Sequence, residues 1–92
     1  MALVSVTHLA TTTRSEIVRP AKQDYIDGKN VEINNEGSVT VYVGGDDLTA
    51  SSGGTPIPAG EQWYLDNSGP TDRLYVITAS GTANLSILWT RV

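Results

Sequence analysis

Two neighbouring acids, Asp46 and Asp47, are the residues with the clearest capacity for chemistry, because divalent cations such as Ca²⁺ prefer carboxylate oxygens. A calcium loop needs further oxygen ligands at fixed spacing, and this stretch has no D-x-D-x-D-G pattern. The glycine pairs at 44–45 and 53–54 are not followed by the lysine of a phosphate-binding loop. The sequence therefore predicts no metal site and no cofactor.

Nucleophilic catalysis is also disfavoured by the residue types. The chain has no cysteine and a single histidine, His8, which lies in a threonine-rich stretch with no carboxylate beside it. Nucleophile–base pairs of the Ser–His or Cys–His kind therefore have almost nothing to build on. The ten acids allow many chance carboxylate pairs, so they do not point to glycosidase chemistry. We expect a protein that is not an enzyme and has no catalytic residues.

The aromatic residues are better candidates for binding. Trp63 and Trp89 lie on the apolar faces of their stretches and are predicted to be core residues. Tyr64 and Tyr75 lie on the opposite faces and are predicted to form a subunit interface, where aromatic residues are enriched. An alternative is a carbohydrate-binding module in which Trp63, Tyr64 or Tyr75 forms an exposed stacking platform.

Size and charge narrow the class of protein. Ninety-two residues make one domain at most. A chain of this size has a marginal core, so a partner that binds the folded state would add stability. Residues 1–30 hold four basic and three acidic side chains, whereas residues 31–92 hold two basic and seven acidic ones. This distribution disfavours nucleic acid as a partner of the acidic part, although counts this small also fluctuate by chance.

Targeting signals are weak. The chain has no apolar run of about 18 residues, so no membrane partner is expected. The first ten residues lack the basic start and long apolar stretch of a signal peptide, and the missing cysteines give no sign of a secreted scaffold. Synthesis in the cytoplasm is the simplest interpretation.

The stretch that must support any site is 38–50. Val39, Val41 and Val43 alternate with Thr40 and Tyr42, which is typical of a strand with one buried face. The glycines and aspartates at 44–47 are expected to end this strand, and the small polar residues at 51–55 to form an exposed loop.

A second strand is expected at Val31–Ile33. The residues Asn34-Asn35-Glu36-Gly37 favour a hairpin loop, with Gly37 at the left-handed position, so this strand is predicted to pair with 39–43.

Further strands are expected at 62–66, 73–79 and 83–90, and turn signals recur every 8–12 residues. This spacing is typical of an all-β protein, either a small antiparallel β-sandwich or a barrel. We assign residues 27–92 to this body. Residues 1–26 are predicted to form an extended N-terminal arm, because Pro20 excludes a helix interior and the apolar residues are few. Whether residues 1–13 pair within their own subunit or with a neighbour is left open.

Three stretches carry a family resemblance: Tyr-Val-Gly-Gly-Asp-Asp-Leu-Thr (42–49), Pro-Ile-Pro-Ala-Gly-Glu-Gln-Trp (56–63) and Arg-Leu-Tyr-Val-Ile-Thr-Ala-Ser-Gly-Thr-Ala (73–83). Together they resemble head decoration (cement) proteins of tailed bacteriophages and related small β-rich virion proteins. The resemblance implies binding to the major capsid protein on the outside of the capsid, with the protein commonly a homotrimer. A tail or connector protein is the alternative within the virion.

The same resemblance implies that the arm binds the capsid. On this interpretation the arm supplies both apolar anchors and basic side chains that pair with carboxylates on the shell. The expected apolar anchors are Val4, Val6, Ile17, Val18 and Tyr25. The expected basic contacts are Arg14, Arg19 and Lys22.

Overall fold

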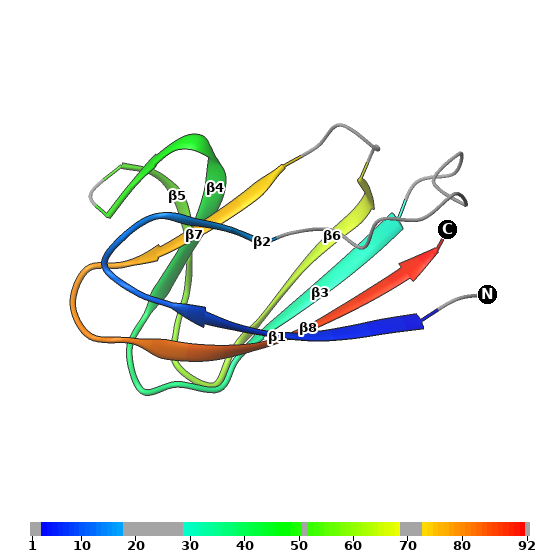
Figure 1. Ribbon diagram of the computed structural model, residues 1–92, viewed down its shortest axis with the longest axis horizontal. Helices are drawn as coiled ribbons and strands as arrows, with labels where there is room; N and C mark the ends of the chain where they lie inside the picture. Colours follow the sequence, from blue (N-terminus) through cyan, green and yellow to red (C-terminus); the bar gives the residue numbers. More distant parts are fainter. Residues whose placement is uncertain (1–2, 18–28, 51, 69–72, 92) are drawn as a thin grey trace.

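The structure is a computed structural model that describes residues 3–17, 29–50, 52–68 and 73–91. Within these ranges the chain forms eight strands and no helix. The strands make two four-stranded sheets that pack face to face (Figure 1). The predicted fold class, a small antiparallel β-sandwich, is confirmed.

The first sheet, called sheet A, has the strand order β1-β8-β3-β6, with every neighbouring pair antiparallel. Its strands are β1 (Leu3–Ala10), β8 (Ala83–Arg91), β3 (Lys29–Asn35) and β6 (Gln62–Ser68). The second sheet, sheet B, has the order β2-β7-β4-β5 and is also antiparallel. Its strands are β2 (Ser15–Ile17), β7 (Leu74–Thr78), β4 (Val41–Thr49) and β5 (Ser52–Ile57).

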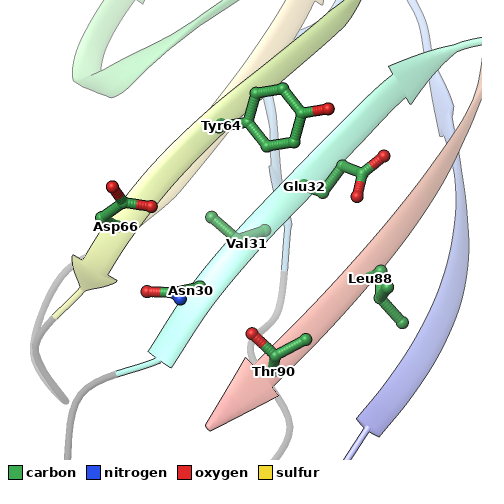
Figure 2. Close-up of a pocket in the computed structure, with 7 residues that line it drawn as sticks. All are labelled: Asn30, Val31, Glu32, Tyr64, Asp66, Leu88 and Thr90. Atoms are coloured by element: carbon green, nitrogen blue, oxygen red, sulfur yellow. The ribbon is translucent and has the colours of Figure 1, made fainter. Parts of the chain in front are cut away.

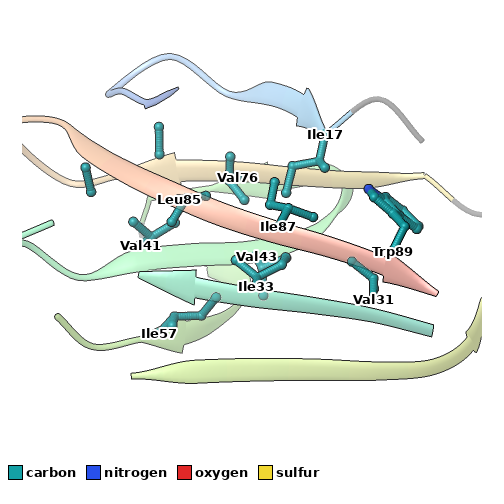
Figure 3. Packing of buried hydrophobic residues seen from close by; sticks show 12 residues of the cluster. Ile17, Val31, Ile33, Val41, Val43, Ile57, Val76, Leu85, Ile87 and Trp89 are labelled. Carbon is teal, nitrogen blue, oxygen red and sulfur yellow. The ribbon is translucent and has the colours of Figure 1, made fainter. Parts of the chain in front are cut away.

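The core lies between the two sheets and follows the two-residue alternation of the strands (Figure 3). The predicted inward face of 39–43 contributes to it together with Leu85 and Ile87, and Trp63 and Trp89 pack there as expected. The buried members are Ala10, Ile17, Val31, Ile33, Val41, Val43, Ile57, Val76, Ala83, Leu85, Ile87 and Trp89. Burying one such aliphatic side chain contributes about 1.5–3 kcal/mol, so this cluster is the main source of stability.

The chain changes sheet at almost every connection. Only β4 and β5 are both consecutive and in the same sheet, and all other consecutive strands lie in opposite sheets. The predicted hairpin between Val31–Ile33 and residues 39–43 is therefore wrong: β3 pairs with β6 and β8, whereas β4 pairs with β5 and β7. The valines of the two strands face each other across the core instead of lying side by side.

Asn35 explains why residues 34–40 cross between the sheets. Its side chain is buried, with 1% exposed. Nδ2 donates to the carbonyls of Val39 and Ile57, both at 2.8 Å, and Oδ1 accepts from the amide of Gly37 at 3.0 Å. The backbone N–H of Asn35 also donates to the carbonyl of Glu61 at 2.9 Å. The side chain and backbone of this one residue thus fix the connection from β3 to β4 and join it to the connection from β5 to β6.

Gly37 is required in this crossover for space and not for a left-handed turn. Its φ is not among the positive values, which belong to Gly53, Gly60 and Gly81. A Cβ at position 37 would lie 2.5 Å from the Ala83 Cβ and 2.7 Å from its Cα. The crossover therefore passes directly over the start of β8, and a larger residue would push these segments apart.

Residues 44–49 and 52–55, expected to end the strand at 39–43 and to form a loop, belong instead to a strand pair. β4 continues to Thr49 with an irregularity after Gly44, and β5 includes most of the predicted loop. Leu48 is buried, and it lies on the outer face of sheet B beside Tyr42 and not in the core between the sheets. A Cβ on Gly54 would lie 2.5 Å from the Leu48 Cδ1, so the glycine makes room for this leucine.

Residues 3–17 belong to the sandwich, which corrects the expectation of an extended arm for this part of 1–26. β1 pairs with β8 from Leu3 to Ala10, and β2 pairs with β7. Ala10 and Ile17 are buried in the shared core. The open question about residues 1–13 is answered for 3–10, which pair within their own chain, while residues 18–26 of the expected arm lie outside the described ranges.

Candidate functional site

The outer face of sheet A is the broad exposed face of the molecule. Antiparallel partners point to the same side of a sheet, so the register places Ser5, Leu88, Glu32 and Tyr64 in one row across all four strands. With strands about 4.8 Å apart, such a row spans about 14 Å. Its neighbours on this face are Thr7, Leu9, Asn30, Asn34, Gln62, Asp66, Asn84, Ser86 and Thr90.

A hollow of about 200 Å³ lies in this face, between β6, β3 and β8 (Figure 2). We call it the Tyr64 hollow. Its lining combines an aromatic ring, a leucine, two carboxylates, an amide and a hydroxyl. The lining residues are Asn30, Val31, Glu32, Tyr64, Asp66, Leu88 and Thr90.

Tyr64 is the more exposed of the two large hydrophobic side chains exposed on this face, with 59% of its surface accessible against 52% for Leu9. Figure 2 shows its ring lying open over the sheet, next to Glu32 on the neighbouring strand. The hydroxyl donates to Oε1 of Gln62 at 2.5 Å, which holds the ring along its own strand. The predicted outward position of Tyr64 is therefore correct, and the aromatic surface is available to a ligand.

Two acids give the Tyr64 hollow its charge. Oε2 of Glu32 accepts a hydrogen bond from Nδ2 of Asn34 at 3.1 Å, and Asp66 is exposed two residues after Tyr64 on the same strand. Among the described residues neither carboxylate has an ion-pair partner. Among the side chains that the structure describes, the lining of the hollow is thus acidic and includes no basic group.

A second, wider hollow of about 340 Å³ lies on the other side of Leu88. It is lined by Ser5, Val6, Thr7, Asn34, Ser86, Ile87 and Leu88. Hydroxyl and amide groups supply its polar lining, and none of the described side chains that line it is charged. Leu88 lines both hollows, so its apolar side chain separates the acidic Tyr64 hollow from the second hollow.

Part of the outer face of sheet B contacts side chains of its own chain. The guanidinium of Arg14 lies over the Tyr75 ring, 5.2 Å from its centroid, and Nη1 of Arg14 donates to the carbonyl of Asp46. Nη1 of Arg73 pairs with Oε2 of Glu16 at 3.2 Å. Tyr75, predicted as an interface residue, is therefore half-buried beneath an arginine from the segment before β2.

The structure disperses the residues predicted to bind a partner. Ile17 is 2% exposed and Val6 packs against the core, so both stabilise the chain itself, which corrects their assignment as surface anchors. Val4 lies on β1 opposite Trp89. Arg14 is held by sheet B. The other predicted contacts, Val18, Arg19, Lys22 and Tyr25, lie outside the described residues.

His8 has a partner that sequence reasoning missed. Its Nε2 lies 2.8 Å from Oγ of Ser15. This contact joins β1 to β2, which are edge strands of opposite sheets. Burial disfavours the charged imidazolium and lowers the pKa of His8. A serine and a histidine in this contact are two parts of a nucleophilic triad, but among the described residues no carboxylate orients the imidazole. The pair acts as a cross-sheet hydrogen bond.

The part of the chain that the structure describes contains no group of three or more metal-ligating side chains and no helix long and apolar enough to cross a membrane.

Sequence reasoning found Tyr64 but not Glu32, Asp66 or Leu88. The available signal was the outward alternation of Asn30, Glu32 and Asn34. This pattern indicates a shared face with Tyr64 and Leu88 only when β3 is known to lie between β6 and β8. The incorrect hairpin placed β3 beside residues 39–43 instead.

No family model matches this chain, and no curated protein matches it.

Proposed function

We propose that this chain is a structural protein of a tailed-bacteriophage virion, made in the host cytoplasm, which decorates and stabilises the outside of the capsid by bridging major capsid protein subunits. The observation that carries the proposal is the combination of a sandwich with one continuous buried core and a broad sheet face that no other described segment covers. Such a molecule is suited to binding through surface area and not to catalysis.

The stretches that resemble decoration proteins have structural roles in this sandwich. Residues 42–49 form β4 with the buried Leu48, residues 56–63 carry the connection from β5 to β6, and residues 73–83 carry β7 and the turn into β8. The resemblance therefore concerns the scaffold. The capsid-binding surface is assigned separately, and we place it on the outer face of sheet A instead of on the N-terminal segment.

Capsid binding is tested by mixing the purified protein with capsids that lack it. Cosedimentation with saturation at many copies per particle, and density over the head in a reconstruction, would support decoration. Density confined to the tail or the portal would replace the proposal with the tail or connector alternative. Light scattering of the free protein tests the expected trimer.

A carbohydrate-binding module is the second candidate, and the exposed ring of Tyr64 favours it. Sugar C–H groups can stack on an aromatic face, and the amides and hydroxyls around both hollows can bond sugar hydroxyls. A glycan array with the wild-type protein and Tyr64→Ala tests it: binding that is lost with the ring would support this function, and a flat array would remove it.

A further inference from the structure

Sheet A presents Tyr64 on its outer face and sheet B presents Tyr42 and Tyr75, and among the described residues the Tyr75 ring is the one with a cation over it. On sheet B the guanidinium of Arg14 stacks on Tyr75, and Glu16 and Arg73 form an ion pair. On sheet A the Tyr64 ring is open, and Glu32 and Asp66 flank it without a cation among the described residues. Sheet A thus exposes an aromatic ring and two carboxylates, whereas the Tyr75 ring and the Glu16 carboxylate of sheet B each contact an arginine of the same chain.

We propose that the Tyr64 hollow binds an arginine side chain supplied by the capsid subunit, an inference that rests on the proposed function. The planar guanidinium stacks on the Tyr64 ring, and its N–H groups donate to the carboxylates of Glu32 and Asp66. Leu88 and the methyl group of Thr90 contact the aliphatic part of the side chain.

Charge and exposure favour this occupant over others. The lining of the hollow is negative, which repels phosphate groups and attracts a cation. Tyrosine and arginine are both enriched at protein interfaces and often dominate their binding energy. In this proposal the acids belong to this chain and the basic side chain belongs to the capsid. The sequence-based expectation was the opposite, with basic residues of this chain contacting acids of the shell.

The first test uses short blocked peptides and the ¹⁵N-labelled protein. A Gly-Arg-Gly peptide is compared with its citrulline counterpart, which keeps the shape of the side chain and removes the charge. We expect the arginine peptide to shift the amide signals of Glu32, Tyr64, Asp66 and Leu88, and the citrulline peptide to leave them in place. Equal shifts from both peptides, or larger shifts at the same amides from chitotriose, would overturn the proposal.

Variants separate the hollow from general charge. Glu32→Gln with Asp66→Asn removes both carboxylates of the hollow, whereas Asp47→Asn with Glu61→Gln removes two exposed acids outside it. We expect the first pair to abolish the peptide-induced shifts and the second pair to retain them. Equal loss in both pairs would mean that net charge alone attracts the peptide. Dispersed amide spectra confirm that each variant is folded.

Capsid binding then separates this inference from the proposed function. We expect Tyr64→Ala and the Glu32/Asp66 pair each to weaken capsid binding about tenfold or more, and the Asp47/Glu61 pair to have little effect. If the wild-type protein binds no capsid, the proposed function fails, and the arginine has another source. If both hollow variants bind capsids as the wild type does, the proposed function stands and this inference is wrong.

Discussion

The two outer faces of the sandwich differ in how their side chains are used. On sheet B, Leu48 folds back beside Tyr42 and Arg14 covers Tyr75, so the chain buries its own apolar and aromatic groups. On sheet A, Tyr64 and Leu9 remain 59% and 52% exposed. Side chains on the outer face of sheet B therefore contribute to the stability of the fold. Those on the outer face of sheet A stay accessible, and this is the face on which we propose that a partner binds.

The strongest way to break this comparison is to remove residues 1–17. The deletion takes away β1, β2 and the buried side chains of Ala10 and Ile17, so both faces lose an edge strand. The expected loss equals the whole stability of such a domain, on the order of 5–10 kcal/mol. The truncated protein should show an unfolded far-UV circular dichroism spectrum. A folded truncated protein would restore the arm hypothesis for this segment.

Next in size is Asn35→Ala, which removes the amide that holds the crossover. The carbonyls of Val39 and Ile57 lose their buried donor, and we expect a loss of roughly 2–4 kcal/mol in the free energy of unfolding. Urea denaturation measures it. Asn34→Ala is the matched control, because Asn34 is only partly buried and should cost less than about 1 kcal/mol. Equal effects would show that Asn35 has no special role.

The comparison is sharpened by Arg14→Met, which uncovers Tyr75 and makes sheet B resemble sheet A. The lost cation–π contact and the lost bond to the Asp46 carbonyl should cost about 1–2 kcal/mol. Arg73→Met removes an exposed ion pair and should cost less than about 0.5 kcal/mol. Thermal melts of both variants measure the difference, and a larger effect at Arg73 would contradict the role given to Arg14.

The smallest expected effect is a pH dependence at His8, where β1 and β2 meet. Since burial lowers the pKa of His8, the unfolded chain binds its proton more readily than the folded one. Folding stability should therefore fall as the pH is lowered from about 7.5 to about 5.5, through the ordinary value of 6.5. His8→Gln should reduce this slope in urea titrations at the two pH values. If His8→Gln left the pH dependence of the unfolding free energy unchanged, that dependence would come from the carboxylates and not from His8.

The strands around 31–33, 39–43, 62–66, 73–79 and 83–90 were predictable, because alternation is a local property. Val41, Val43, Leu85 and Ile87 are buried as that pattern indicates. The pairing of strands was not predictable, because it depends on the bonds that Asn35 makes with residues far along the chain. Local turn chemistry alone favours a hairpin at this point.

The N-terminal segment was misjudged for a related reason. Ile17 is one apolar residue among polar ones, and its burial depends on pairing with Leu74. The outward position of Tyr64 followed from its strand, but the covering of Tyr75 did not. That covering depends on Arg14, which no local pattern connects to β7.

The position of β8 has a consequence for how the protein is made. β8 follows every other described strand along the chain, yet it lies inside sheet A, between β1 and β3. Until it has left the ribosome, β1 has no partner in its sheet and β3 exposes an unpaired edge. Contacts between distant segments also slow folding. The protein should therefore fold only after synthesis of β8, and chains stalled before it should be prone to aggregation.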